Sequence, residues 1–538
     1  MANRKRLIFL TLVLLLLLST SCAASPTGNE TSATSAGTTA PVSTSSQTTQ
    51  TTDLNGRPDA ASGILRLWWS KRGSLNPLLD RSQSGQAVNQ LIFQGLFSID
   101  STQKYQFQLA RDIRFTANGK QVMIDLAPDV VFHDGSKLTA ADVVACINFI
   151  LSNPDQSDYS QSLQVIQSVT TIGPSTIRLT LTQPDPWLPY ALTFPVLTAA
   201  SLSLGPFDLV PGSGPFRMQS YDAENGLTLK KVSLTGDDSE MTTVSLTEFN
   251  NLAEAMRAFE NDAIDLVNLT AAEYSRYMLR NSLRFEQYTG NQLLFLAYNT
   301  QEKKLLADSS RLTFLKQLLN PVAFSEAGAA DWGESTCLPL AATTWTIREA
   351  KIRQVLDTLG KPAWDATDKK LRVLVLADDS FQQQAMGLVC GLLDRAGVAW
   401  QLESLAAADY WAALAEGAYD LTIMDAVLPV QPDPSWLYRD DRPGRYGVLS
   451  SLAGKGLDEY DLWRQKLVLS LSPVNCEMLP SGQDYADTLA ETAARAPWSI
   501  LVLRSGAILY GDRVIGQCQP DQNNPFKGIE ELWIWSGE

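Results

Sequence analysis

Strand-like and helix-like stretches alternate through the second half of this 538-residue chain. The runs LRVLVLADD, AWQLESL and YDLTIMDAVLP favour buried strands, and QQQAMGLVCGLLDRAGV and DYWAALAEGA between them favour helices. Neighbouring parallel strands need a long crossover, usually a helix, so this alternation predicts a sheet covered by helices. The region from residue 301 to residue 497 is therefore predicted to be an α/β lobe with its own sheet.

The first half of the chain carries strands of its own. ILRLWW (64–69), QVMIDLAPDVVF and TIRLTLTQPD favour strands, and AVNQLIFQGLF favours a helix ending near Gly95. FRMQSYD and LTLKKV are predicted to pair as a hairpin, and LLFLAYNT (293–300) is a further buried strand. A chain of this length can bury several cores without metals or disulfides, so no cofactor is expected.

The stretch VVFHDGSKLTAADVVACINFIL contains His133, which is the only histidine in the chain. Asp134 and Gly135 favour a tight turn, and Thr139 followed three residues later by Asp142 predicts a capping box before an apolar helix. A catalytic histidine would need a nucleophile or a second ligand, and the sequence contains no GxSxG, HExxH or Cys/His pairing. The stretch is therefore predicted to be a structural corner.

The amino-terminal residues form an export signal. MANRKRLIFLTLVLLLLLSTSC has three cationic residues, a short apolar run and small residues before Cys22. The ending resembles the lipobox of bacterial lipoproteins, although Ser19 replaces the usual leucine, so Cys22 is the expected lipidation site. The alternative is an ordinary secretory signal with an incidental cysteine.

The stretch after Cys22 predicts a disordered tether that reaches to about Ser62, because it is rich in Ser, Thr, Gly and Gln and has no apolar periodicity. A lipid anchor followed by a long tether favours the outer face of the cytoplasmic membrane, with a Gram-positive cell preferred to a periplasm. The formal net charge is −15, and removal of the signal deletes three positive charges, which leaves −18. This surface repels nucleic acid and anionic lipid, so the expected partners are neutral or cationic solutes, or a membrane protein complex.

Five cysteines remain after Cys22, so they cannot all pair. Cys146 and Cys390 lie in apolar helical patterns and are expected in the core. A disulfide between Cys476 and Cys518 is compatible with an exported protein but does not follow from the sequence. The chain has no CxxC, and its single histidine argues against a zinc site.

FHDGSKLTAADVV is similar to a signature of the extracytoplasmic solute-binding proteins of peptide, nickel and related ABC importers, called family 5. The segments LNPLL, LIFQGLF, TIRLTLTQPDPWLPYAL, GSGPFRMQSY, FLAYNT and YDLTIMDAVLPVQPDPSWL fall in the family's order. The resemblance covers nearly the whole chain from residue 62 to residue 538.

The resemblance implies an α/β, two-lobed clamshell of the periplasmic-binding-protein type, type II-like, with an extra subdomain in the first lobe. It implies a monomer that closes on a solute and delivers it to a membrane permease. The hinge strands would lie near Ala297 to Thr300 and Ile500 to Ser505. The expected boundaries are a signal at 1–21, a tether at 22–61, a first lobe at 62–300 with the subdomain at about 96–200, a second lobe at 301–497, and a return to the first lobe at 498–538.

Two ligand anchors of the family are missing from this sequence. Family members that bind dipeptides hold the amine with an aspartate three residues before an Asp-Pro, and here that position is Val430. They hold the carboxylate with an arginine just after the first strand of the second lobe, where this chain reads ADDSFQQ. A short zwitterionic peptide is therefore disfavoured, because buried charges need partners. A longer peptide held through its backbone, or a cationic or sugar-like solute, is favoured.

The candidate ligand contacts follow from these positions. Asp378, Asp379 and Asp425 are the candidate charge partners, with the alternative that they cap turns and face water. Strand alternation sends one tryptophan of the first strand to the core and leaves the other for stacking on a ligand. The remaining candidates are Trp68, Trp69, Asn291, Gln292 and Trp436, and for Trp436 packing is the preferred alternative.

Two other functions compete with a solute-binding role in transport. An extracellular hydrolase could use the paired acids Asp378 and Asp379, but adjacent strand residues point to opposite faces. No enzymatic activity is therefore expected. A receptor that passes a peptide signal to a sensor would have the same fold, and the sequence does not separate it from a transport component.

Overall fold

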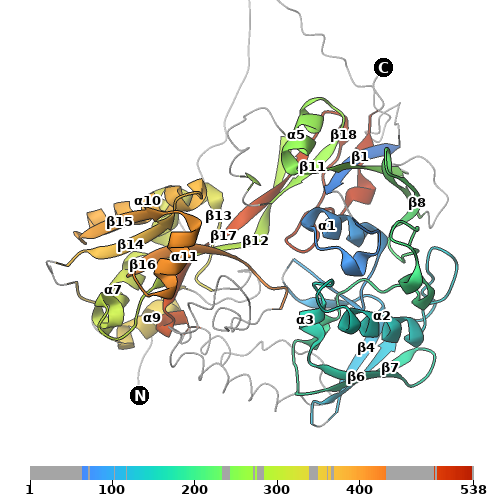
Figure 1. Ribbon diagram of the computed structural model, residues 1–538, viewed down its shortest axis with the longest axis horizontal. Coiled ribbons are helices and arrows are strands. Elements are labelled where there is room, and N and C mark those ends of the chain that lie inside the picture. Colours follow the sequence, from blue (N-terminus) through green and yellow to red (C-terminus); the bar gives the residue numbers. More distant parts are fainter. Residues whose placement is uncertain are drawn as a thin grey trace, which may run out of the picture. The chain divides into compact units, whose positions relative to one another are not determined.

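The structure is a computed structural model, shown in Figure 1. The chain divides into Met1–Thr51 and Thr52–Glu538, and every residue described here belongs to the second unit. The described residues are 63–70, 73–101, 103–116, 118–232, 243–270, 273–274, 284–338, 349–359, 362–364, 369–431, 490 and 493–535. Among them, no helix combines the length and apolar character needed to cross a bilayer.

A four-stranded sheet lies next to the helix α1 (Gln83–Ile92). Its strand order is β1 (Ile64–Ser70), β10 (Thr243–Phe249), β9 (Gly226–Lys231) and β8 (Phe216–Asp222), with β1 parallel to β10 and the other pairs antiparallel. The predicted hairpin is confirmed in β8 and β9. Helix α1 ends at Ile92 rather than near Gly95, and Gly95 approaches the Thr193 carbonyl so closely that a Cβ would lie 2.7 Å from its oxygen.

A second four-stranded sheet packs against the helix α2 (Ala140–Ser152). It is antiparallel, in the order β4 (Ala110–Phe115), β5 (Gln121–Leu126), β7 (Thr176–Leu181) and β6 (Ile166–Thr171). The predicted strand QVMIDLAPDVVF ends at Leu126, and Val131 forms only an isolated bridge with Lys137. Shorter elements nearby are η1 (Pro77–Leu79), the hairpin β2 (Phe97–Ile99) with β3 (Tyr105–Phe107), α3 (Ser160–Leu163), α4 (Leu188–Ala191) and η2 (Ala199–Ser203).

The third sheet has seven strands and contains the predicted α/β alternation. Its order is β11 (Leu266–Leu269), β17 (Trp498–Tyr510), β12 (Arg284–Tyr298), β16 (Leu421–Val427), β14 (Leu371–Leu376) and β15 (Trp400–Leu405), and β13 (Gly333–Ser335) pairs with β17. Strand β14 is parallel to both β15 and β16, whereas β12 is antiparallel to β16 and β17. The sheet is therefore mixed, with the parallel part where the sequence predicted it.

Helices cover both faces of the parallel part of this sheet. Alternate residues of β12 belong to different apolar clusters, with Leu294 and Leu296 in one and Leu293 and Phe295 in the other. The first cluster includes α10 (Ser380–Arg395), α7 (Ser309–Leu318) and α8 (Pro321–Phe324). The second includes α9 (Glu349–Leu359) and α11 (Ala407–Ala415). The short element η3 (Leu305–Ala307) precedes α7, and η4 (Ser325–Ala329) and η5 (Ala330–Trp332) lie between α8 and β13.

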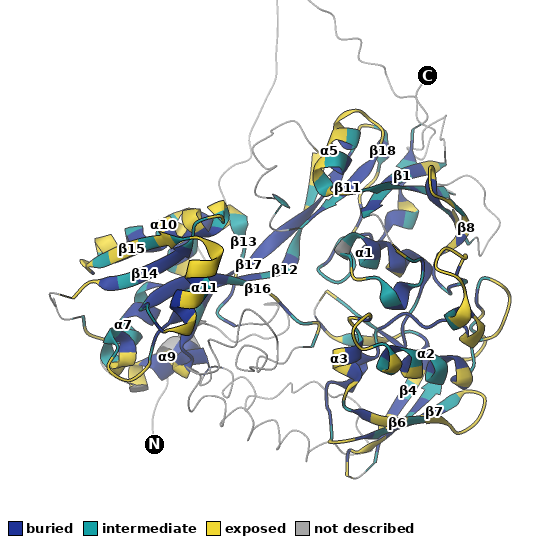
Figure 2. Cartoon of the chain, in the orientation of Figure 1, coloured by how far each residue is buried: buried dark blue, intermediate teal, exposed yellow. Residues whose placement is uncertain are grey.

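Strands β12 and β17 are the longest described strands, and Figure 2 colours much of their length as buried. They link separate apolar clusters. Residues 293–298 pack in the two clusters of the mixed sheet, while Ala507 and Leu509 of β17 pack with β11 and α5 (Leu252–Glu260). A register shift separates Thr289 from Gln292, and a Cβ on Gly290 would lie 2.5 Å from the Arg504 carbonyl oxygen. The segment from Gly290 to Gln292 was expected to precede the strand. It lies inside β12, because pairing with β17 resumes on both sides of this irregularity.

A buried ammonium group holds the start of β17. The Lys316 Nζ of α7 donates hydrogen bonds to the carbonyl oxygens of Ala493, Ala496 and Trp498, at 2.9, 2.6 and 2.9 Å. Burial lowers the pKa of the Lys316 ammonium to about 7. The three hydrogen bonds fix the start of β17 and the residues just before it to α7.

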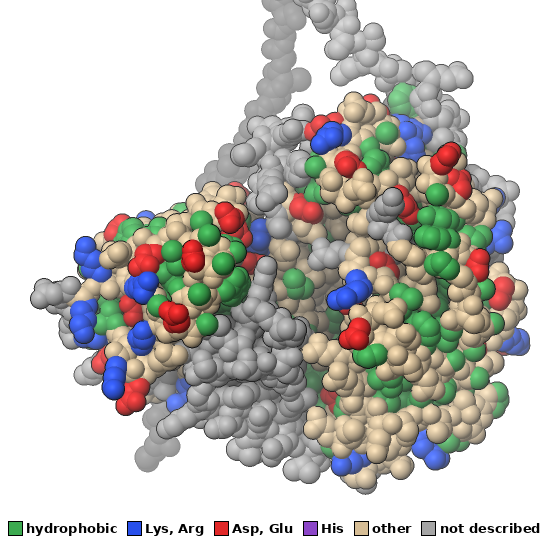
Figure 3. Space-filling view, in the orientation of Figure 1, with side chains coloured by type: hydrophobic (Ala, Val, Ile, Leu, Met, Phe, Trp, Pro, Cys, Tyr) green, Lys and Arg blue, Asp and Glu red, His purple; other side chains and the backbone are tan. Residues whose placement is uncertain are grey.

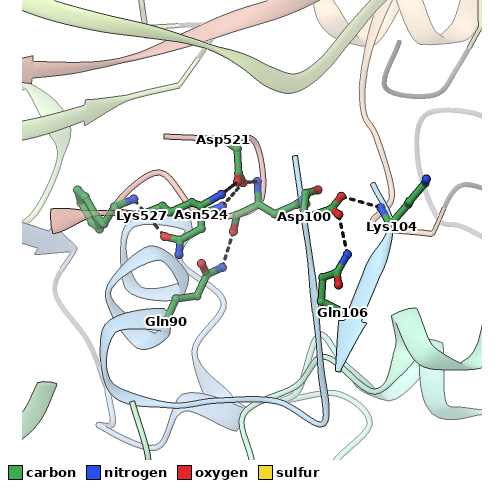
Figure 4. A network of polar contacts seen from close by, with 9 residues as sticks. Gln90, Asp100, Lys104, Gln106, Asp521, Asn524 and Lys527 are labelled. Atoms are coloured by element: carbon green, nitrogen blue, oxygen red, sulfur yellow. Dashed lines mark hydrogen bonds and ion pairs between the residues drawn. The ribbon is translucent and has the colours of Figure 1, made fainter. Parts of the chain in front are cut away.

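The carboxy-terminal segment packs in the apolar cluster that contains β1 and α1. Val514, Phe526 and Ile529 pack there with β1 and α1, next to the hairpin β18 (Val514–Ile515) with β19 (Trp533–Ile534) and η7 (Ile529–Glu531). Figure 4 shows the polar contacts that accompany this packing. Asp521 Oδ1 accepts from the Asn524 amide at 2.8 Å, and Gln90 of α1 donates to the Asn523 carbonyl. The domain boundaries given above remain predictions.

Candidate functional site

One polar region in the part of the chain that the structure describes is the corner around His133. The His133 ring bridges two backbone groups: Nδ1 accepts from the Gly212 amide at 3.1 Å, and Nε2 lies 2.9 Å from the Gly214 carbonyl oxygen, to which it donates. Desolvation lowers the pKa of His133, which favours this neutral ring. The predicted capping box is present. Asp142 accepts from the amide and hydroxyl of Thr139 at 2.9 and 2.6 Å, and from the Ala199 amide at 2.8 Å.

The second polar region lies where two parallel strands end. Strands β14 and β16 are parallel, so their carboxyl ends meet at the same edge of the mixed sheet, where α/β folds usually bind ligands. Asp379 follows β14 and caps α10, because its Oδ1 accepts from the Gln382 amide at 2.9 Å. Asp425 is near the end of β16. Both acids therefore lie at this edge.

Polar residues replace apolar ones near the same edge of three neighbouring strands. On the face that α10 covers, Leu294 and Leu296 of β12, Ile423 of β16 and Val502 of β17 are all buried. The next residue on that same face of each strand is polar, because successive side chains alternate between faces. Pairing joins Leu294 to Asp425 and Gln292 to Arg504. We call Gln292, Asp425 and Arg504 the polar row.

Helix α10 supplies further contacts to the polar row. Gln382 Nε2 donates to Asp425 Oδ1 at 2.6 Å. The Arg504 guanidinium lies over the Phe381 ring, 3.6 Å from its centroid, and Phe381 packs against Trp332 at 4.8 Å between centroids. Burial lowers the pKa of Arg504 to about 10, while the charges of Asp425 and Asp379 act in the opposite direction. The polar row thus contains a buried cation that faces two carboxylates.

Two amide oxygens at the polar row are buried without a hydrogen-bond donor among the described residues: Gln292 Oε1 and Gln382 Oε1. The orientation of the Gln382 amide is fixed, because its nitrogen must face the Asp425 carboxylate. An unpaired buried acceptor costs roughly 1–3 kcal/mol. The region can therefore accept hydrogen bonds from a bound molecule.

The structure brings some of the predicted site residues together and separates others. Asp379, Asp425 and Gln292 lie at the polar row, whereas Asp378 is exposed and Asn291 is half-buried, with its carbonyl accepting from the Leu428 amide. Alternation leaves Trp69 fully buried in the cluster that contains β1 and α1. Trp68 is half-buried against the cluster of β11 and α5, and contact with a ligand stays a prediction for it. Trp436 and Cys22 lie outside the described residues.

Sequence reasoning missed Arg504, Gln382 and Phe381. A signal for Arg504 was present, because it interrupts the apolar run SILVLRSGAILY. An arginine was sought directly after β14 and was not found there. The cation in contact with that segment comes instead from β17, more than a hundred residues later in the chain.

The cysteine predictions can be checked in part. Cys146 and Cys390 are buried, as expected. Cys518 is also buried and has a free thiol, while its suggested partner Cys476 lies outside the described residues.

Figure 3 shows charged side chains of both signs interspersed over α10, α11 and the neighbouring strands on the visible face. No single-sign patch marks that part of the surface.

Comparison with known proteins supports the resemblance found in the sequence. Residues 104–315 match the model of the bacterial extracellular solute-binding proteins, family 5, middle region. The glutathione-binding protein GsiB of Salmonella typhi is 27% identical over 179 residues, which are 32% of this chain and 35% of that protein. The match thus spans about a third of the length of this curated relative.

Solved structures match over most of the chain. An ABC transporter substrate-binding protein of Listeria monocytogenes, CtaP, has a TM-score of 0.65 and 18% identity, and covers 88% of this chain and all of its own. The oligopeptide-binding protein AppA of Bacillus subtilis, solved with a nonapeptide, has a TM-score of 0.52 and 17% identity, with 88% of this chain and 99% of its own covered. These similarities show the two-lobed α/β fold. Residues 104–315 of the chain are thus similar to the bacterial extracellular solute-binding proteins of family 5, and its fold is similar to that of solved ABC transporter substrate-binding proteins.

Proposed function

We propose that this chain is the solute-binding component of an ABC importer, and that it captures a peptide or a related solute at the polar row and delivers it to a membrane permease. The observation that carries the proposal is the convergence of Asp379, Gln382, Asp425 and Arg504 at the carboxyl ends of β14 and β16. The relatives named above bind glutathione or a nonapeptide, which supports a peptide-like solute.

The solute is expected to bring hydrogen-bond donors to the polar row. Gln292 and Gln382 present acceptors, and two carboxylates face a single guanidinium. A molecule with amide or ammonium groups supplies the complementary donors. A longer peptide or a cationic solute therefore fits these residues better than an anionic one.

The location proposed for the protein is the outer face of the cytoplasmic membrane, with a lipid anchor on Cys22. The support is the apolar run followed by small residues and this cysteine in the sequence. Metabolic labelling with a palmitate analogue tests the anchor: the wild-type protein should be labelled and Cys22→Ser should not. Equal labelling of both would disprove the assignment to Cys22.

Thermal unfolding of the purified protein with a panel of solutes tests the binding function. A solute present at a hundred times its dissociation constant should stabilise the folded state by about 2.7 kcal/mol. The panel should contain di- to nonapeptides, polyamines and oligosaccharides. Stabilisation by longer peptides or polyamines supports the proposal, and a selective response to free dipeptides contradicts the proposed solute class.

A further inference from the structure

The polar row and the start of α10 contain two acceptors whose role the fold does not explain. Gln382 is only 6% exposed, and its amide nitrogen is committed to Asp425. Its oxygen and the oxygen of Gln292 are buried without a donor among the described residues. Both glutamines thus retain an acceptor after the contacts of the folded chain have been formed.

These two acceptors lie near one another. Gln292 of β12 pairs with Val427 of β16, and Leu294 pairs with Asp425, so Gln292 and Asp425 are diagonal neighbours on one face of the sheet. Diagonal neighbours are about 7–8 Å apart, within reach of long side chains. Because Gln382 bonds directly to Asp425, the two glutamines flank the same carboxylate.

We propose that Gln292 and Gln382 determine the specificity of the solute site, and that their side-chain oxygens accept hydrogen bonds from an N–H donor group of the solute. This inference rests on the proposed function. The two carboxylates, Asp379 and Asp425, act on the cation Arg504, so the groups left to face a solute are acceptors in negatively charged surroundings. These surroundings favour an amide or ammonium donor over an anionic group.

The proposal predicts that removing a glutamine has opposite effects on stability and on binding. Replacing an unpaired buried acceptor with an apolar side chain of similar shape is neutral or stabilising for the unliganded protein. The same change removes a contact to the solute. Gln292→Met should therefore keep or raise the melting temperature while it weakens binding, whereas a merely structural glutamine would lower the melting temperature when replaced.

Titration calorimetry on the full chain tests the inference with four probes: pentaalanine amide, N-acetyl-pentaalanine amide, spermidine and maltotriose. The first two distinguish an ammonium from an amide donor, spermidine has no amide, and maltotriose has only O–H donors. The comparison includes wild type, Gln292→Met and Gln382→Met. Gln401→Met is the control, because Gln401 is exposed on β15.

We expect at least one N–H probe to bind the wild type, and Gln292→Met to weaken that binding by about fivefold or more, the value of a typical net hydrogen bond. Gln401→Met should change neither the melting temperature nor the affinity for the probe. If Gln382→Met fails to fold, Gln292→Met still decides the question. Affinities within about twofold of wild type for the folded glutamine variants overturn the inference alone. Binding limited to maltotriose overturns both the inference and the proposed solute class. If no probe binds the wild type, both the inference and the proposed solute class are wrong.

Discussion

The corner around His133 and the polar row around Asp425 are built from similar residues but differ in how their polar groups are paired. At the corner, both ring nitrogens of His133 have backbone partners, and the Asp142 carboxylate accepts three hydrogen bonds. At the polar row, two buried amide oxygens have no donor among the described residues. A corner whose bonds are complete stabilises the fold, whereas acceptors left over at the end of a sheet can bind a solute.

The largest effect expected on either side of this comparison is the loss of stability in Asp142→Ala. The change deletes an acceptor of three hydrogen bonds from a buried helix start, and leaves the Ala199 amide without its partner. The free energy of unfolding should fall by about 3 kcal/mol, because bonds to charged groups are worth about 1.5–3 kcal/mol. Urea unfolding measures this change.

The control for that variant is Asp378→Ala, because Asp378 is exposed. Its unfolding free energy should stay within about 0.5 kcal/mol of wild type. An Asp142→Ala protein as stable as this control would show that the corner does not hold the fold as described. Solute affinity should be the same in both variants if Asp378 has no part in binding.

At the polar row, the expected effect is on binding. Asp425→Asn keeps the size of the side chain but removes one of the two charges that face Arg504. Affinity for the solute that gives the largest thermal shift should fall roughly tenfold, about 1.4 kcal/mol. The loss of unfolding free energy should be smaller than in Asp142→Ala. An unchanged dissociation constant would show that Asp425 is not part of the solute site.

The smallest effect concerns the charge state of His133. Burial lowers its pKa below the usual 6.5, so the unfolded chain binds more protons near that pH than the folded chain does. Stability contributed by the neutral ring is therefore present above pH 6.5 and is lost as the pH falls through the lowered value. Because the chain has a single histidine, one imidazole resonance reports the titration in an NMR experiment.

The control for this titration is His133→Gln, which cannot become protonated in that range. Its melting temperature should change less than that of wild type when the pH is lowered from about 7.5 to about 5. A wild-type titration midpoint at or above 6.5 would contradict the paired, neutral ring.

The sequence predicted those helices and strands that are determined by local sequence patterns. The apolar runs of β14 and β16, the helix α10 between them, and the Thr139 and Asp142 pair at the start of α2 were all recognised from their patterns. Strand β12 was expected to begin at residue 293 and in fact begins at Arg284. Its first part reads RFEQYTGNQ and has no apolar run, so its pairing with β17 depends on a partner that is distant in sequence.

The candidate site was predicted only in part for the same reason. Asp379 and Asp425 could be found because Asp379 follows a recognisable strand and Asp425 lies near the end of one. The contact of Arg504 with Phe381 joins segments that lie more than a hundred residues apart, and only the order of strands in the sheet brings them together. The unpaired oxygen of Gln382 likewise becomes visible only when the partner of its nitrogen is known.

Hydrogen exchange measured by mass spectrometry, with and without the solute that stabilises the protein most, tests the central claim directly. The account predicts slower exchange in segments that include residues 379–383 and 423–428, and no change at residues 132–142. Protection confined to the His133 corner, or solute binding that leaves the polar row unprotected, would contradict the assignment of the site.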